Sequence, residues 1–212
     1  MHKTQATLIL DTRDVVGESM VWDERRSRLV WVDIIGRRIH LLDPVSGAHE
    51  TWPTPDLVTS IGLRQDGGAI VGLRKEIALW DFGGPFRRIA TIDPDRPDTR
   101  LNEGVVAPDG RFVTADTMKN ALYSYRWDRK ASRLAERLPF FTGFERGLPD
   151  GSCLDAQGYV WNCRVVGGSC LARIGPEGRL DGIVELPCSW PTSCAFGGAG
   201  LDTLFVTSAR FT

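Results

Sequence analysis

The chain has 212 residues, of which 42% are hydrophobic and 25% are charged, so it can bury the core of a globular domain. Its 26 Lys and Arg residues are balanced by 27 Asp and Glu residues, and the sequence pI is about 6.3. This balance excludes the basic surface of a nucleic-acid-binding protein. The sequence lacks the run of about 18 apolar residues that a membrane span requires, and MHKTQATLIL lacks the apolar stretch of a secretion signal. We therefore expect a cytoplasmic protein that binds neither nucleic acid nor membranes.

A short strand, a turn and a stronger strand recur along the chain. The repeated segments are SMVWDERRSRLVWVD, GLRQDGGAIVGL, GVVAPDGRFVTAD, SCLDAQGYVWNCR and SCAFGGAGLDTLFVTSA. The acidic turn residues of the first four segments, Asp23, Asp66, Asp109 and Asp155, lie roughly 43 to 46 residues apart, which is the length of a β-propeller blade.

Two further strands follow each of the first four segments. The third strands are RIHLLDP, IALWDF, ALYSYRWD and CLARIGP, and the fourth strands are HETWP, RRIATID, RLAERLPF and GIVELP. Four short strands in each repeat predict an all-β fold of the β-propeller type, with Asp66-Gly67, Asp109-Gly110 and Gln157-Gly158 at hairpin turns. No segment shows a sustained helical period, so we expect little helix. A β-sandwich is the structural alternative.

The sequence contains four complete repeats and a partial fifth repeat that runs from Pro191 to Thr212. We expect residues 1–212 to form a single domain that is an incomplete propeller. An open ring leaves strand edges unpaired, and unpaired edges favour self-association.

Cysteine and histidine residues show no metal-binding spacing. All five cysteines lie in the last third of the chain without a CxxC pair, and the odd number argues against a disulfide framework. We interpret them as small buried hydrophobic residues. The histidines His2, His40 and His49 are scattered and form no HxH or HExxH motif. Any metal ion must therefore be held mainly by oxygen atoms.

Residues just before the inner strand of each blade converge at one end of a propeller channel. When the repeats are aligned on their hairpin glycines, Asn102, Asp150 and Thr59 occupy the same position, and Glu18 lies at or near it in the first repeat. Two carboxylates and an amide suit a hard divalent cation. Each residue taken alone is equally compatible with a turn or capping role.

The sequence resembles the SMP-30/gluconolactonase/luciferin-regenerating-enzyme family, which includes regucalcin. The matching stretches are VGESMVWDERRSRLVWVDIIGRRIHLLDP, TRLNEGVVAPDGRF, RGLPDGSCLDAQGYVWNCRVVGGSCLARI and PTSCAFGGAGLDTLFVTSA. The resemblance implies a six-bladed propeller with one divalent metal ion held by a Glu, an Asn and an Asp. Glu18 matches the family's Glu and Asp150 its Asp, while Arg100 and Asn102 match an RxN motif that contacts the lactone.

The sequence departs from the family in its middle. Members carry the RxN strand in one blade and a separate Asn-bearing strand, the metal ligand, in the next. Here TRLNEGVVAPDGRF begins like the former, and VTADTMKNALYSYRWD continues like the latter. About one blade is therefore expected to be absent, together with the end of the last blade. Asn102 is then assigned either to the metal or to the substrate.

The resemblance implies a metal-dependent lactonase that opens sugar lactones to aldonic acids, with Ca²⁺, Zn²⁺, Mg²⁺, Mn²⁺ or Fe²⁺ as the cation. Asp150 is the candidate metal ligand and general base, Glu18 holds the metal, and Arg100 positions the substrate, although Arg100 is also compatible with a plain surface charge. Two alternatives stay open. One is a non-catalytic propeller fragment, and the other is a metal-dependent esterase that acts on other esters.

Overall fold

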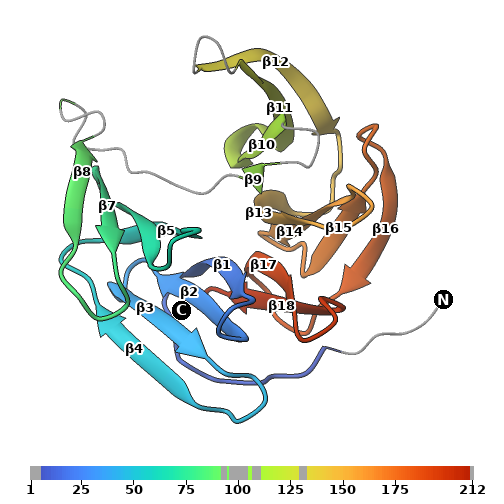
Figure 1. Cartoon of the computed structure of the whole chain (residues 1–212). Coiled ribbons are helices and arrows are strands. Elements are labelled where there is room, and N and C mark those ends of the chain that lie inside the picture. The colour runs from blue at the N-terminus through green and yellow to red at the C-terminus, as the bar shows by residue number, and fades with distance from the viewer. Residues whose placement is uncertain (1–5, 92–94, 96–104, 107–110, 129–132, 211–212) are drawn as a thin grey trace. The chain divides into compact units, whose positions relative to one another are not determined.

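The protein is all-β, as the repeats predict (Figure 1). The computed structural model describes residues 6–91, 95, 105–106, 111–128 and 133–210. These residues form four four-stranded antiparallel sheets and one two-stranded sheet. Within the described ranges the only helical segment is a single 3-10 turn, η1 (Thr117–Lys119), and no helix there is long and apolar enough to cross a membrane. The four complete repeats and the partial fifth are thus confirmed.

Each four-stranded sheet is a meander in which consecutive strands pair. The first sheet contains β1 (Gly17–Asp23), β2 (Arg28–Asp33), β3 (Arg38–Leu42) and β4 (His49–Pro53). The second contains β5 (Val58–Leu63), β6 (Ala69–Leu73), β7 (Glu76–Trp80) and β8 (Arg87–Thr91). The third contains β9 (Val105–Val106), β10 (Arg111–Asp116), β11 (Ala121–Asp128) and β12 (Arg133–Thr142). The fourth contains β13 (Leu148–Leu154), β14 (Val160–Val165), β15 (Cys170–Ile174) and β16 (Leu180–Glu185), and the two-stranded sheet contains β17 (Pro191–Gly197) and β18 (Thr203–Ser208).

Burial falls from the second and third strands of a sheet to its last strand. Strands β2, β3 and β6 are mostly buried, whereas β4 and β8 are mostly exposed. The predicted hairpin glycines Gly67 and Gly158 have φ angles of 94° and 83°, a conformation that glycine adopts without steric cost. The hairpins therefore follow the turn chemistry of the sequence.

The chain forms two compact units, each with its own hydrophobic core. The first unit comprises residues 1–8 and 104–195, and the second comprises residues 9–103 and 196–212. The core of the second unit includes Val32, Ile39, Val71 and Trp80, and that of the first includes Leu122, Val160 and Ile174. A single domain over residues 1–212 stays a prediction.

Within each unit, the first strand of one sheet contacts the neighbouring sheet. In the second unit β1 lies against β5, and the buried Ser19 Oγ accepts a hydrogen bond of 2.9 Å from the Ile61 amide. The residues after β18 pair with the segment before β1, since the Arg210 amide donates to the Val15 carbonyl at 3.1 Å. In the first unit β13 lies against β10 and β11. These contacts fix the first strands, which carry the candidate site residues.

Candidate active site

Glu18 lies on β1 in the second unit and is only 4% exposed. The strand has a β-bulge there, because pairing shifts between Glu18, opposite Val32, and Val21, opposite Val30. Ser19 adopts a φ of 52°, and its amide donates to Glu18 Oε2 at 3.2 Å. A bulge bends the strand and redirects its side chains, and the Ser19–Ile61 hydrogen bond holds this one in place. Glu18 is therefore a buried carboxylate on a fixed, irregular backbone.

Asp150 lies on β13 in the first unit and is partly buried. Its strand also has a β-bulge, since Pro149 pairs with Arg164 and the next pair joins Ser152 to Asn162. Asp150 and Gly151 thus share one place in the ladder, which is the usual form of a bulge next to a functional site. The first strand of the second sheet has a register shift between Val58 and Ser60, on either side of Thr59.

Thr59 and Asp150 thus occupy matching places, each the first unpaired residue at the register shift in the first strand of its sheet, whereas Glu18 lies one residue before the equivalent place in β1. The alignment on hairpin glycines predicts the shared register of Thr59 and Asp150 and places Glu18 at or near it, and the ladder puts Glu18 one residue before it. Thr59 is fully buried, and its hydroxyl donates to the Gly72 carbonyl at 3.1 Å. At this position the second repeat therefore carries a structural hydroxyl where the fourth repeat carries the carboxylate of Asp150.

The backbone around Asp150 is held by a buried amide on the neighbouring strand. Asn162 has no exposed surface, and its Nδ2 donates to the Asp150 carbonyl at 2.7 Å and contacts Ser152 Oγ at 3.0 Å. Asn162 Oδ1 in turn accepts from Arg164 Nη1 at 3.2 Å. Asn162 therefore links the bulge of Asp150 to a buried arginine.

Arg164 is 1% exposed, which is unusual for a charged side chain. Its assigned hydrogen bonds run to neutral oxygen atoms, namely the carbonyls of Phe144, Arg146 and Gly147 and the side-chain amides of Asn120 and Asn162. Burial lowers the pKa of Arg164 to about 10. The guanidinium thus ties the segment before β13 to β14. Sequence reasoning missed this role, although an Asn and an Arg two residues apart in a buried strand were the available signal.

Arg100 and Asn102 lie outside the described residues. The nearest described strand after them is β9, whose Val105 and Val106 pair with β10. Their assignment to substrate or metal stays a prediction. Among the residues that the structure describes, no three His, Cys, Asp or Glu side chains form a group that could hold a metal ion. The donors predicted from sequence, two carboxylates and an amide carbonyl, are the oxygen ligands that a hard divalent cation prefers.

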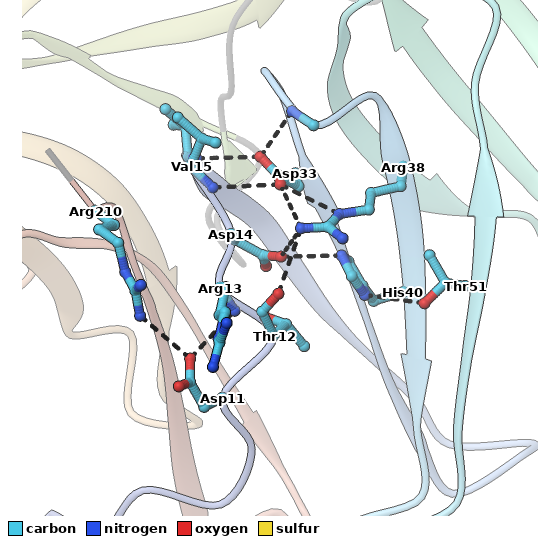
Figure 2. Close-up of polar contacts among 12 residues, drawn as sticks. Asp11, Thr12, Arg13, Asp14, Val15, Asp33, Arg38, His40, Thr51 and Arg210 are labelled. Atoms are coloured by element: carbon cyan, nitrogen blue, oxygen red, sulfur yellow. Dashed lines mark hydrogen bonds and ion pairs between the residues drawn. The ribbon is translucent and has the colours of Figure 1, made fainter. Parts of the chain in front are cut away.

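A second polar cluster lies on the first sheet, beside the segment that leads into β1 (Figure 2). Asp14 accepts from Trp31 Nε1 at 2.8 Å and from Arg38 Nη2 at 3.2 Å. His40 Nε2 lies 3.2 Å from Asp14 Oδ1, although the contact is not aligned as a hydrogen bond. His40 Nδ1 lies 2.9 Å from His49 Nε2, and the two rings stack with each other and with Trp31. The two histidines, scattered in sequence, are thus neighbours.

Hydrogen bonds and charge interactions connect this second cluster to the segment before β1. Burial alone would raise the pKa of Asp14, but contacts with His40, Trp31 and Thr12 lower it below the ordinary value. Burial and the neighbouring His40 lower the pKa of His49. Asp33 accepts from the Val15 and Val16 amides at 3.3 and 3.1 Å and from Arg38. The cluster anchors the segment before β1, so we assign it a structural role.

Comparison with known proteins places the chain in a family. The model of the SMP-30/gluconolactonase/LRE-like region matches residues 16–115 and 112–210. The 6-deoxy-6-sulfogluconolactonase of Pseudomonas putida is 31% identical, with 92% of this chain and 84% of that protein covered. The pentonolactonase XacC of Haloferax volcanii is 30% identical, with 96% and 84% covered. The solved structure of a calcium-binding protein, regucalcin, from Agrobacterium tumefaciens is similar with a TM-score of 0.85 at 23% identity, over 94% of this chain and 84% of that one.

The comparisons also bear on the predicted internal gap. The alignment with the Pseudomonas protein runs over 245 residues, more than the 212 of this chain, so some of its positions have no counterpart here. The two matches to the family model meet at residues 112–115. These residues lie in β10, where the RxN-type segment gives way to VTADTMKNALYSYRWD. The junction of the two matches thus lies in the third sheet.

Proposed function

The chain belongs to the SMP-30/gluconolactonase/LRE-like family, and from this premise we propose that it is a divalent-metal-dependent lactonase that hydrolyses sugar lactones to aldonic acids. The observation that carries the proposal is the placement of Glu18 and Asp150 in the first strands of their sheets, with Asp150 inside the β-bulge of β13 and Glu18 directly before the β-bulge of β1. Two curated relatives that align over most of their length are named as lactonases of sugar acids. Their names support the substrate class.

Glu18, Asp150 and Asn102 would hold the cation, because hard divalent ions select carboxylate and amide oxygens. The structural relative described as calcium-binding supports a divalent ion. When bound, such an ion polarises a carbonyl group and lowers the pKa of water. Ca²⁺, Zn²⁺, Mg²⁺, Mn²⁺ and Fe²⁺ all fit this donor set.

Asp150 is the proposed general base, since a carboxylate within hydrogen-bond reach of the attacking water can accept its proton. The water adds to the lactone carbonyl carbon, the ring C–O bond breaks, and the ring oxygen leaves as a hydroxyl group of the aldonic acid. Asn162 and Arg164 hold the backbone of the bulge that carries Asp150. Fixed positioning of a reacting group lowers the barrier without a new contact in the transition state.

Arg100 would orient the sugar hydroxyls or the developing carboxylate through its planar set of N–H donors. Asn102 would serve either this substrate or the metal. Because the family's separate Asn-bearing strand has no counterpart here, we assign Asn102 to the metal first. We further propose a single cytoplasmic domain whose unpaired strand edges permit self-association.

The test is proton release from glucono-, galactono- and xylonolactone in a pH-stat, with the complete chain. The protein is first stripped with a chelator, and each of the five cations is then restored separately. We expect turnover to disappear on chelation and to return with at least one cation. Turnover that survives complete chelation contradicts metal dependence, and a folded protein inactive on all three lactones under every cation contradicts the lactonase assignment.

A further inference from the structure

Three cysteine thiols far apart in sequence meet inside the first unit. Cys153 lies on β13 and is partly exposed, Cys163 lies on β14 and is fully buried, and Cys194 lies on β17 and is 1% exposed. The Sγ atoms of Cys153 and Cys194 are 3.4 Å apart, and Cys163 also contacts Cys194. The five cysteines are all free thiols in the structure.

The placement of Cys153 and Cys194 suits a direct bond between them. They lie 41 residues apart in the chain, on strands of different sheets. Cys194 Sγ lies 3.4 Å from the carbonyl oxygen of Trp161, the residue that pairs with Cys153 across β13 and β14. The Cys194 thiol is thus held beside the strand that carries Cys153. A disulfide has an S–S length of about 2.05 Å, so the two sulfur atoms need to approach by little more than an ångström.

We propose that Cys153 and Cys194 form a reversible disulfide when the protein meets hydrogen peroxide or another hydroperoxide. The Cys153 sulfur attacks the peroxide and is oxidised to sulfenic acid, and the O–O bond breaks to release water, or an alcohol when the oxidant is an organic hydroperoxide. The Cys194 thiol then attacks this sulfur, the S–S bond forms, and the sulfenic oxygen leaves as water. A dithiol reductant restores both thiols by exchange.

Exposure decides the order of these steps. Cys153 is the one member of the trio with appreciable access to solvent, so it meets the oxidant first. The Cys194 thiol lies beside the thiols of Cys153 and Cys163. Hydrogen bonds from these two thiols lower the pKa of Cys194. A resolving cysteine attacks more readily as its thiolate fraction rises. Burial raises the pKa of Cys163, which leaves Cys163 as a supporting thiol.

The other two cysteines, Cys170 and Cys188, are expected to react more slowly with peroxide than the Cys153–Cys194 pair. Burial raises the pKa of Cys170 and of Cys188, and protonated thiols react slowly with peroxide. Cys170 lies on β15 and Cys188 lies between β16 and β17. Cys188 is also only partly buried, like Cys153. Cys188→Ser is therefore a matched control for Cys153→Ser.

A disulfide here would join the first strand of the fourth sheet to β17. It would close the span of 41 residues between the two cysteines, and such a crosslink stabilises the folded chain by restricting the unfolded one. Cys153 also lies three residues after Asp150 on the same strand. Oxidation would therefore stiffen the strand that carries the candidate base. The disulfide itself does not depend on the proposed function.

The test is intact and peptide mass spectrometry of the complete folded chain after brief treatment with hydrogen peroxide and alkylation of the remaining thiols. We expect a product lighter by two hydrogen atoms, which the dithiol reductant reverses. Trypsin should then yield a linked pair of peptides, residues 147–164 and 180–210. Cys153→Ser should abolish this linked pair, whereas Cys188→Ser and Cys163→Ser should retain it.

Several outcomes overturn the proposal. The first is a folded wild-type protein in which peroxide yields only sulfinic acid. The second is a disulfide-linked peptide pair that persists in Cys153→Ser. The third is a disulfide that forms only between two chains. Unfolding of the wild-type protein followed with and without reductant adds a second readout, since the oxidised form should unfold at the higher temperature. The mass measurement holds whether or not the chain hydrolyses lactones.

Discussion

Asn162 Nδ2 donates a hydrogen bond of 2.7 Å to the backbone carbonyl of Asp150, across the β-bulge of β13. The bond joins a fully buried amide to the candidate base. Because this bond is made to the backbone oxygen and not to the carboxylate of Asp150, Asn162 positions the candidate base without changing the basicity of its carboxylate. The site therefore depends on residues that never touch the substrate.

Replacement of Asn162 by Ala tests this positioning role. The change leaves the Asp150 carbonyl and Arg164 Nη1 without their partner, and an unsatisfied buried group costs about 1–3 kcal/mol. We expect lactonase kcat to fall by more than tenfold while KM changes little, because substrate contacts are unchanged.

Asn120→Ala is the matched control for Asn162→Ala. Asn120 also binds Arg164, at 2.6 Å, but has no assigned bond to the Asp150 bulge. Asn120→Ala should lower the free energy of unfolding by an amount similar to that of Asn162→Ala, but it should reduce kcat less. Equal loss of kcat in the two variants would show that Asn162 acts through stability alone.

Arg164→Lys tests the buried guanidinium. An ammonium group cannot reach the carbonyls of Phe144, Arg146 and Gly147 and both amides at once, because it lacks the fork of five donors. We expect the free energy of unfolding, measured by urea titration, to fall by at least about 2 kcal/mol. The exposed Arg126→Lys, on β11, should change it by no more than about 0.5 kcal/mol. A neutral result for Arg164→Lys would contradict the assigned network.

The bulge at Glu18 makes a prediction about Ser19. Its φ of 52° favours glycine, and its Oγ accepts from the Ile61 amide. Ser19→Ala loses the hydrogen bond and keeps the strained backbone, so it should destabilise by about 1–3 kcal/mol. Ser19→Gly loses the same bond but tolerates positive φ. Urea unfolding should therefore rank wild type above Gly and Gly above Ala, and the reverse order of the two variants would contradict the bulge geometry.

The cluster in Figure 2 predicts acid sensitivity. The pKa of His49 is lower in the folded protein than the ordinary 6.5, so the unfolded chain binds more protons as the pH falls below that value, and stability is lost there. The lowered pKa of Asp14 has the same sign below its ordinary 3.8. His49→Gln should flatten the fall in unfolding free energy between about pH 7.5 and about pH 5.5.

Asp181→Asn, an exposed change on β16, is the control for this pH dependence and should leave the slope unchanged. The slopes are compared by urea titration at each pH. If the unfolding free energy falls equally steeply with pH in His49→Gln and in the wild type, His49 is not the source of the acid sensitivity.

Much of the fold was predictable from local signals. Alternating strands and the hairpin glycines Gly67 and Gly158 define the repeats, because turn type and side-chain period are set within a few residues. The placement of Glu18 and Asp150 beside the bulges of their first strands follows from the same repeat, with an offset of one residue. An internal gap was also predicted from the sequence. The two family matches meet in β10, where Phe112 pairs with Val106 on one side and with Tyr125 on the other, as in an uninterrupted sheet.

The long-range contacts were not predictable from local signals. Arg164 takes its partners from β14, from the segment before β13 and from Asn120 next to η1. The contacts between His40 and His49 and between Cys153 and Cys194 likewise depend on packing. The interpretation of the cysteines as small buried hydrophobic residues fits Cys163 and Cys194 but overlooks that their thiols meet.

The most direct test of the central claim compares the catalytic efficiency of Asp150→Asn with that of Asp181→Asn on the preferred lactone, with the activating cation in excess. Loss of a general base costs about 10²–10⁴ in rate, so Asp150→Asn should lose at least about 100-fold in kcat/KM while Asp181→Asn stays near wild type. An Asp150→Asn variant that stays folded and retains wild-type kcat/KM would contradict the account.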